Sequence, residues 1–524
     1  MSYRGGWMGV SAVPGSGKTE TLSNLAARLI QDGAVGDGQE VLIVTFANSA
    51  VQNFESRIRR ILDETGLLAI GYRVRTLHGL CHDIIRERPS LVGLPNDFQI
   101  ADERVTGGIL QDAAEAWVRS HPDFGQEWLD PDLSPGQVQK VLREGWPDLV
   151  KKIGYQFIKT AKDLQANPPA VRHRLEEIHT RLPLLEMGLE IYSDYQKALS
   201  YRGAVDFDDL IRLALAALEQ DSDYLARLRA RWPFILEDEA QDSNLLQEGI
   251  LSRLAGMDGN WVRVGDPNQA IYETFTTASP RYLRAFITRV EQKPELLYSG
   301  RSTQTIMGLG NALVEWSRRD HPVMDLCDTL AETLIHATPL GDPQPNPPDD
   351  PLKVSIQRKP LSPDDELNRV VKSVRRWLDD PRHEMETLAI LAFQNDRGAA
   401  FVDRFNRDGI PCIEVLKSTQ ETRRAAQAIS SILHCLAWPD QSSPLDRAYR
   451  DWLAFRNERQ SEAAVEDSLG SRVISRIKNP EEYLWSAGWE ALPGIQAARQ
   501  TAPAVFETLA AFREAARRWQ AAVH

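Results

Sequence analysis

The stretch AVPGSGKTET, residues 12–21, constrains the fold of this 524-residue chain more than any other. An apolar run with strand character, WMGV at residues 7–10, precedes it, and a helix-like segment, residues 20–30, follows it. A strand, a glycine-rich turn and a helix in this order are typical of a phosphate-binding P-loop, because the amides of the turn and the positive end of the helix face the same anion. We therefore expect a nucleotide phosphate site here.

The residues of this stretch have separate predicted roles. Gly15 and Gly17 let the backbone curl round a β-phosphate, Lys18 reaches the β- and γ-phosphates, and Thr19 holds Mg²⁺. The strict pattern begins with glycine where this chain has Ala12, but GSGKT is complete, so a chance turn before a helix is the weaker interpretation. The predicted nucleotide-binding residues are Ala12, Gly15, Ser16, Gly17, Lys18, Thr19 and Glu20.

Two further segments supply what a P-loop needs for hydrolysis. In FILEDEAQD, residues 234–242, an apolar strand leads into Asp238, the predicted metal-side carboxylate, and Glu239, the predicted general base for water. A solvated acidic loop after a strand is the alternative, but it would have to coincide with a P-loop in the same chain. In VRVGDPNQAIY, residues 262–272, Gln269 follows another apolar strand and is the predicted γ-phosphate sensor.

These segments belong to an ordered set that resembles the UvrD/Rep-like superfamily 1A DNA helicases. The matching segments are AVPGSGKT (12–19), VTFANSAV (44–51), TLHGLCHDIIR (76–86), VDFDDLI (205–211), ILEDEAQD (235–242), VGDPNQAIY (264–272) and GRSTQTI (300–306). They are similar to the family motifs I, Ia, Ib, Ic, II, III and IV in the family order. The resemblance weakens after residue 306 and extends to about residue 415.

The resemblance implies an ATP- and Mg²⁺-dependent motor that moves 3′→5′ along single-stranded DNA and unwinds duplex. It implies catalytic roles for Asp238, Glu239 and Gln269, and for Arg301 as a γ-phosphate contact from the second motor domain. It also implies DNA binding by Thr45, Phe46, Asn48, Thr76 and His78, with Phe275 as a further stacking ring. The implied partners are single-stranded DNA and single-strand/duplex junctions, with a nuclease or repair partner unidentified.

The chain departs from the family pattern at several positions. No glutamine precedes Ala12, whereas the family reads adenine with one, and Gly300 stands where the family has a tyrosine that stacks on adenine. After residue 272 the sequence ETFTTAS replaces the family's aromatic-Arg-Gly-Ala run. Motifs V and VI, with the second γ-phosphate arginine, are not recognisable in residues 420–524. The chain is therefore a fragment of a longer motor, a divergent member of the family or one half of a split motor, and we favour the fragment.

The fold class that we expect is α/β, with two RecA-like P-loop NTPase domains and inserted helical subdomains. Alternating short apolar strands and helices predict mainly parallel sheets with helices on both faces. The expected ranges are 1–97 and 203–295 for the first RecA-like domain (1A), 98–202 for its helical insert (1B), 296–415 for part of a second RecA-like domain (2A), and 416–524 for a partial helical region (2B).

Three local features add detail to this organisation. Lys151, Lys152, Lys159 and Lys162 lie close together in the helical insert, where they face either phosphate or only solvent. PLGDPQPNPPDDP, residues 339–351, is too rich in turn residues for a helix or strand and is expected to be an exposed loop. The tryptophans of the C-terminal region are interpreted as core residues; they are Trp438, Trp452, Trp485, Trp489 and Trp519.

Composition narrows the function classes further. The net charge of −13 argues against a protein that coats nucleic acid indiscriminately, although it allows a local basic track. The 4 cysteines are scattered without a CxxC pair, so the sequence predicts neither a zinc site nor a disulfide framework. No apolar run is long enough to span a bilayer and no secretion signal is recognisable, so we expect a cytoplasmic protein without a membrane partner.

The sequence is compatible with three functions. The leading hypothesis is an ATP-dependent 3′→5′ DNA helicase or translocase. The alternative from another class is an ATP- and DNA-binding regulatory or partner subunit with little independent unwinding, which the unrecognised motifs favour. A P-loop kinase or signalling GTPase is weaker, because the sequence has no candidate acceptor-binding lid.

Overall fold

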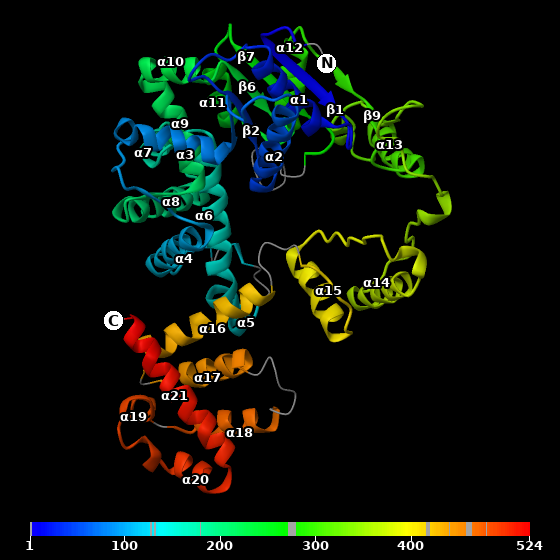
Figure 1. Ribbon diagram of the computed structural model, residues 1–524. Helices are drawn as coiled ribbons and strands as arrows, with labels where there is room; N and C mark the ends of the chain where they lie inside the picture. Colours follow the sequence, from blue (N-terminus) through cyan, green and yellow to red (C-terminus); the bar gives the residue numbers. More distant parts are fainter. Residues whose placement is uncertain are drawn as a thin grey trace. The chain divides into compact units, whose positions relative to one another are not determined.

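The computed structural model describes residues 3–523 except 126–127, 130–132, 179, 271–278, 415–419, 440, 457–463 and 478. It divides into two compact units, Met1–Ser355 and Ile356–His524, which we describe separately. The first unit contains a six-stranded sheet in the order β3-β2-β6-β7-β1-β8, in which every pairing is parallel (Figure 1). The strands are β1 (Trp7–Ala12), β2 (Val41–Thr45), β3 (Tyr72–Thr76), β6 (Phe234–Glu237), β7 (Asn260–Gly265) and β8 (Glu295–Leu296).

Helices cover both faces of this sheet, as a doubly wound α/β fold requires. One core contains α1 (Lys18–Gln31) and α2 (Asn48–Glu64), which pack Leu22 and Phe54 onto Val10 and its neighbours. The opposite core includes α3 (Leu77–Glu87), α9 (Phe207–Gln220), α10 (Ser222–Arg231), α11 (Leu245–Ala255) and α12 (Pro280–Arg289). The predicted α/β class with a parallel sheet is therefore confirmed, and the sheet is consistent with a RecA-like domain.

The register of the sheet brings the predicted motifs to one edge. Thr45 at the end of β2 pairs with Thr76 at the end of β3, and Ser11 near the end of β1 pairs with Gly265 at the end of β7. Because all these strands are parallel, the loops that follow them leave the sheet on the same side. The P-loop, the acidic segment and the sensor loop are thus neighbours in space.

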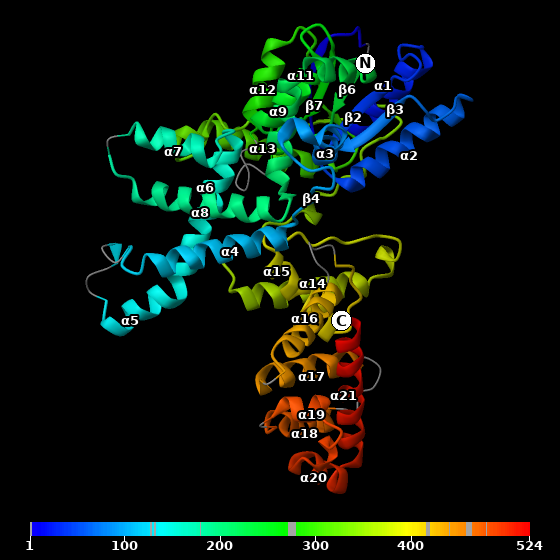
Figure 2. The same cartoon turned by 90° about the vertical axis from the view of Figure 1, so that its left-hand side faces the viewer.

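Residues 98–202 leave this domain and return to it beside their starting point. The two-residue strand β4 (Gln99–Ile100) pairs in parallel with β5 (Ala204–Val205), and the described residues between them are helical or irregular. The helices are α4 (Glu103–Ser120), α5 (Pro135–Lys140), α6 (Trp146–Asp163), α7 (Pro168–Glu176) and α8 (Pro183–Tyr201). Helices α4, α6 and α8 pack against one another around their own core (Figures 1 and 2).

One lysine of the insert does not face phosphate or solvent. The Lys162 side chain is 1% exposed, and its Nζ lies 2.5 Å from Asp206 Oδ2 and 2.9 Å from Asp209 Oδ2 on α9 and its N-cap. Tyr195 of α8 donates to the same Asp206 oxygen at 2.7 Å. Both predicted alternatives, phosphate and solvent, are therefore wrong for Lys162, because its charge is paired with two carboxylates of the sheet domain.

The neighbouring Asp208 predicts a pH-dependent stability. Burial, reinforced by the charge of Asp206, raises the Asp208 pKa to about 6. A raised carboxyl pKa stabilises the fold at low pH, and this contribution is lost as the pH rises from about 4 to about 6. We expect Asp208→Asn to match the original protein near pH 4 and to exceed its free energy of unfolding by about 1–2 kcal/mol at pH 7.

Urea unfolding at both pH values checks this expectation. The exposed Asp223 of α10 provides the matched control, since Asp223→Asn is expected to leave the difference between the two pH values unchanged. An equal stability of Asp208→Asn and the original protein at pH 7 would contradict the prediction.

The second RecA-like sheet is not shown by the structure. Between residues 296 and 414 the described strands are the end of β8, which joins the first sheet, and the two-residue pair β9 (Tyr298–Ser299) and β10 (His336–Ala337). The helices here are α13 (Gln304–Asp320), α14 (Pro363–Leu378) and α15 (Asn395–Arg407). The apolar residues 388–393 form neither helix nor strand, and Leu391 and Phe393 are fully exposed; among the described residues no neighbouring strand pairs with them.

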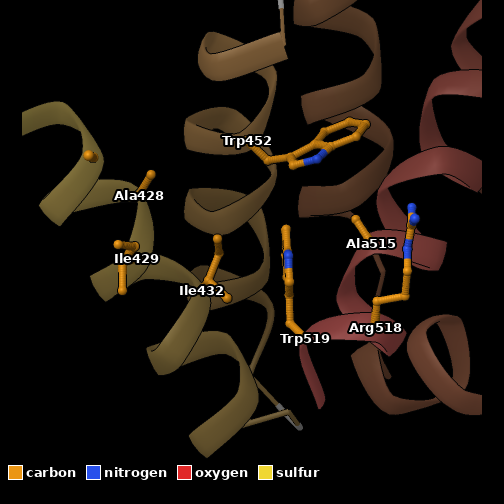
Figure 3. Close-up of a pocket in the computed structure, with 8 residues that line it drawn as sticks. Ala428, Ile429, Ile432, Trp452, Ala515, Arg518 and Trp519 are labelled. Carbon is orange, nitrogen blue, oxygen red and sulfur yellow. The ribbon is translucent and has the colours of Figure 1, made fainter. Parts of the chain in front are cut away.

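The described part of the C-terminal region of the second unit is helical. Its helices are α16 (Gln420–Ala437), α17 (Ser442–Arg456), α18 (Ala464–Ser475), α19 (Pro480–Trp485), α20 (Pro493–Thr501) and α21 (Pro503–Val523). Trp489 is buried in their core, whereas Trp438 is 49% exposed, so the interpretation of all five tryptophans as core is too broad. Trp452 and Trp519 line a cavity of about 550 Å³ between α16, α17 and α21 (Figure 3).

Candidate nucleotide-binding site

The P-loop has the backbone that its glycines predict. Gly15 and Gly17 have φ of 73° and 81°, in the left-handed region that side chains disfavour, and α1 begins at Lys18. A Cβ on Gly15 would lie 2.6 Å from the Arg301 Cβ, so a larger residue would displace that arginine. Ser16 Oγ donates to the Val13 carbonyl at 2.8 Å, and Ala12 is buried as the last residue of β1. Ala12 therefore belongs to the buried strand that precedes the loop.

A chain of polar contacts connects the P-loop to the sensor loop. Lys18 Nζ lies 3.0 Å from Glu239 Oε2, and Gln241 Nε2 donates to the same oxygen at 2.8 Å. Gln241 Oε1 accepts from the Asp266 amide at 3.0 Å, and Gln269 Nε2 donates to Asp266 Oδ2 at 2.9 Å. The structure therefore joins three residues that the sequence places in separate motifs, through two that the sequence did not single out.

The two adjacent carboxyl groups differ in their ionisation. Burial, with the charge of Glu239 in support, raises the Asp238 pKa to about 7. Burial also opposes ionisation of Glu239, but Lys18, Gln241 and Arg301 outweigh it, and the pKa of Glu239 is lowered. Glu239 also has a left-handed backbone, with φ of 52°, which is a strained position for this residue type. Glu239 is thus the ionised carboxylate of the pair, whereas a nearby cation would favour the ionised form of Asp238.

The residues predicted to hold Mg²⁺ fit that ion. Asp238 is 3% exposed, and within the described part of the chain no hydrogen-bond donor reaches its Oδ1. Thr19 lies in the first turn of α1, beside Lys18. A carboxylate and a hydroxyl are the hard oxygen ligands that Mg²⁺ takes from a protein when phosphates supply the others. Among the described residues no group of three or more His, Cys, Asp or Glu forms a separate metal site.

The site contains a cavity of about 600 Å³, which is within the usual size range of ligand pockets; Thr19 and Glu239 line it, but Asp238 does not. The lining residues are Pro14, Gly15, Gly17, Lys18, Thr19, Glu20, Arg57, Glu239, Gln269, Arg301, Pro343 and Gln344. Arg57 of α2 forms an ion pair with Glu20, and Pro343 and Gln344 belong to the proline-rich loop. The sequence analysis did not predict Arg57, Pro343 or Gln344 as site residues, since nothing in their local sequence marks them. Gln241 and Asp266 could have been found, because both lie inside the quoted motifs.

A buried ion pair between Arg263 and Glu237 lies in the sheet next to the site. Arg263 of β7 is 0% exposed, and its Nε lies 2.8 Å from Glu237 Oε2 on the adjacent strand β6. Arg263 also contacts Glu248 Oε2 of α11 at 2.8 Å, and Ser243 donates to Glu237 Oε1 at 2.6 Å. Glu237 immediately precedes Asp238, so this network fixes the strand end that carries the two catalytic candidates. The sequence analysis did not single out either partner.

The residues predicted to bind DNA follow β2 and β3, next to the nucleotide edge. Asn48 is exposed at the start of α2, Phe46 is half-buried, and Thr45 is only 1% exposed. The Thr76 hydroxyl accepts from the Gly79 amide at 3.1 Å as the N-cap of α3. His78 packs its ring against Phe207, with 5.7 Å between centroids, and burial lowers its pKa. Phe275 lies outside the described residues.

The parallel sheet, the P-loop and the adjacent pair of Asp238 and Glu239 are features of a P-loop nucleotide-binding domain. Residues 2–291 match the family model of the UvrD/REP helicase N-terminal domain, which covers more than half of the chain. The chain belongs to this family, and the predicted resemblance is confirmed. Among the described residues, no helix has both the length and the apolar character to cross a membrane.

Two relatives show how far the similarity extends. The ATP-dependent DNA helicase PcrA of Staphylococcus aureus is 25% identical over 314 residues, covering 58% of this chain and 37% of that protein. PcrA of Staphylococcus epidermidis is 24% identical over 443 residues, covering 84% of this chain and 53% of that protein. The matched part of the chain therefore spans about half, or less, of the length of these relatives.

Proposed function

We propose that this chain binds ATP with Mg²⁺ and hydrolyses it to drive 3′→5′ movement along single-stranded DNA, as part of a UvrD-type motor that unwinds duplex at junctions. The observation that carries the proposal is the chain of contacts from Lys18 through Glu239, Gln241 and Asp266 to Gln269. It connects the phosphate loop to a sensor, which a motor uses and a simple phosphate-binding protein does not need. Membership of the helicase family supports the same conclusion.

Each side chain has a role in this proposal. Lys18 and the P-loop amides bind the phosphates, and Thr19 and Asp238 hold Mg²⁺, which neutralises phosphate charge when bound. Glu239 remains ionised at neutral pH because its pKa is lowered, so it is suited to accept a proton from the attacking water. Gln269 transmits the state of the site through Asp266 and Gln241.

The DNA track follows the ends of β2 and β3. Asn48 offers an exposed amide and Phe46 a half-buried ring, the combination of backbone contact and base stacking that suits single strands. The segments after β2 and β3 start from the same sheet as the P-loop. A movement of this sheet edge would therefore be passed directly to the bound DNA, without an intervening domain.

ATP hydrolysis by this chain with and without single-stranded DNA tests the proposal. We expect hydrolysis that single-stranded DNA stimulates several-fold, and complete loss in Lys18→Ala, which serves as the blank. Filter binding of labelled DNA to both proteins shows that the blank still folds and binds. Hydrolysis that DNA does not affect would contradict the motor.

A second candidate is an ATP- and DNA-binding subunit that hardly turns over. One observation favours it: in the described part of residues 296–415 the only separate sheet is the two-residue parallel pair of β9 and β10, which is too small for a second motor domain. The same assay separates the two functions, because binding of ATP and DNA without hydrolysis identifies the subunit.

A further inference from the structure

One side of the nucleotide cavity is formed by the proline-rich loop, to which the proposed mechanism assigns no role. Pro343 and Gln344 line the cavity together with the P-loop, and Gln344 also lines an adjoining cavity of about 200 Å³ with Tyr298, Gly300 and Gly17. The polar residue that this loop contributes to both cavities is thus a glutamine that is not part of any recognised motif.

The loop is anchored to the segment that carries Arg301. Asn346 Nδ2 donates to the Ser299 carbonyl at 2.5 Å and to the Ser302 carbonyl at 2.9 Å. Asn346 Oδ1 accepts from the Thr338 amide at 2.8 Å, and the Gln344 amide donates to Asp342 Oδ1 at 2.8 Å. Gln344 is therefore presented to the cavity from a loop with defined hydrogen bonds on both sides of it.

Gly300 shows that this arrangement excludes a side chain at that position. A Cβ on Gly300 would lie 2.1 Å from the Gln344 carbonyl oxygen and 3.0 Å from its Cγ. No side chain fits unless the loop moves away. The volume that a larger residue would occupy beside the P-loop is thus filled by Gln344.

The lining of the cavity separates into two groups. The P-loop residues and Lys18 surround the phosphate position, and Glu239, Gln269 and Arg301 are the candidates for its γ-phosphate side. The remaining side chains are Glu20, paired with Arg57, and the loop residues Pro343 and Gln344. If the phosphates of a nucleotide lie in the P-loop, its nucleoside would lie beside this second group of residues.

We propose that Gln344 recognises the base of the bound nucleotide and selects adenine. This inference rests on the proposed binding of a nucleoside triphosphate in the P-loop. A glutamine amide supplies one acceptor and two donors, which match the amino donor N6 and the acceptor N7 of adenine. Guanine presents two acceptors, O6 and N7, on the same edge, so it leaves the Gln344 oxygen facing an acceptor.

The test is the equilibrium Kd for ATP and for GTP, measured with Mg²⁺ by displacement of a fluorescent ATP analogue from the full chain. We expect the original protein to prefer ATP, and Gln344→Ala to bind ATP about tenfold more weakly with little change for GTP. Gln344→Glu, whose carboxylate only accepts hydrogen bonds, is expected to weaken ATP binding as well without a gain for GTP, because it loses the donor to N7, which is an acceptor in both bases. Asn346→Ala releases the loop and should weaken ATP binding in the same direction.

Gln357→Ala is the matched control, because Gln357 is an exposed glutamine of the second unit that does not line the cavity. If the ratio of the two Kd values in Gln344→Ala stays within about twofold of the original, or if the original protein binds neither nucleotide, the inference is overturned. Because the readout is binding, a chain that discriminates through Gln344 but does not hydrolyse ATP would support the inference while removing the proposed motor. Gln344 is exposed, so its replacement leaves the fold intact.

Discussion

Replacing Arg301 by alanine is expected to lower the kcat of DNA-stimulated ATP hydrolysis by about a thousandfold. Arg301 lines the cavity, and its charge helps to lower the pKa of Glu239, so the guanidinium lies within electrostatic reach of the proposed base. Among the described residues it forms no ion pair, which leaves the positive charge for phosphate. The effect should fall on kcat, because an arginine in this position stabilises charge that develops as the phosphoryl group is transferred.

Two variants and one binding measurement separate this role from a structural one. Arg301→Lys keeps the charge but not the planar fork, so it is expected to recover only part of the rate. Arg319→Ala, at an exposed arginine of α13 that pairs with Glu315, is expected to behave like the original protein. Steady-state kinetics gives kcat, and ATP displacement gives Kd. A kcat of Arg301→Ala within a few-fold of the original would contradict the assignment.

Replacing Arg263 by methionine is expected to lower the free energy of unfolding by about 3–5 kcal/mol. The change leaves Glu237 buried without its main counter-charge, because Arg263 and Glu237 are 0% and 1% exposed and lie on adjacent strands. Burial already raises the pKa of Glu237 despite Arg263. In the variant Glu237 should take up a proton more readily, so the loss of stability should shrink as the pH falls.

The double variant Arg263→Met/Glu237→Val distinguishes an unpaired charge from lost packing. Two apolar side chains of similar volume are expected to recover stability to within about 1 kcal/mol of the original, because a buried pair contributes little net free energy. Urea unfolding measures all three proteins, and Arg319→Met at the exposed pair gives the surface baseline. A double variant as unstable as Arg263→Met alone would contradict this explanation.

The sequence predicted those parts of the fold and site in which a local pattern determines geometry. Gly15 and Gly17 mark a left-handed turn before a helix, and FILEDEAQD marks the end of a buried strand, so both could be placed on the sheet. Parallel pairing then brings their loops together, which follows from the fold class alone.

What the sequence did not predict depends on contacts between distant segments. Nothing near Lys162 distinguishes it from the exposed Lys152 of the same helix, and only packing against α9 shows that it is buried. Gln344 comes 325 positions after Thr19 (344 − 19) and reaches the same cavity through hydrogen bonds of Asn346 to the backbone at residues 299 and 302. The apolar residues 388–393 have the composition of a strand, but a strand forms only with a neighbouring strand, and the local sequence does not show whether one is present.

The parallel pairing of β4 with β5 has a consequence for how this family can diversify. The chain leaves the sheet domain at Gln99–Ile100 and returns at Ala204–Val205, so the two ends of the insert lie side by side. The helices between these two strands can therefore lengthen, shorten or be exchanged without altering the strand order of the six-stranded sheet. Any such change would have to keep the contacts of Lys162 with Asp206 and Asp209, which hold the insert against α9.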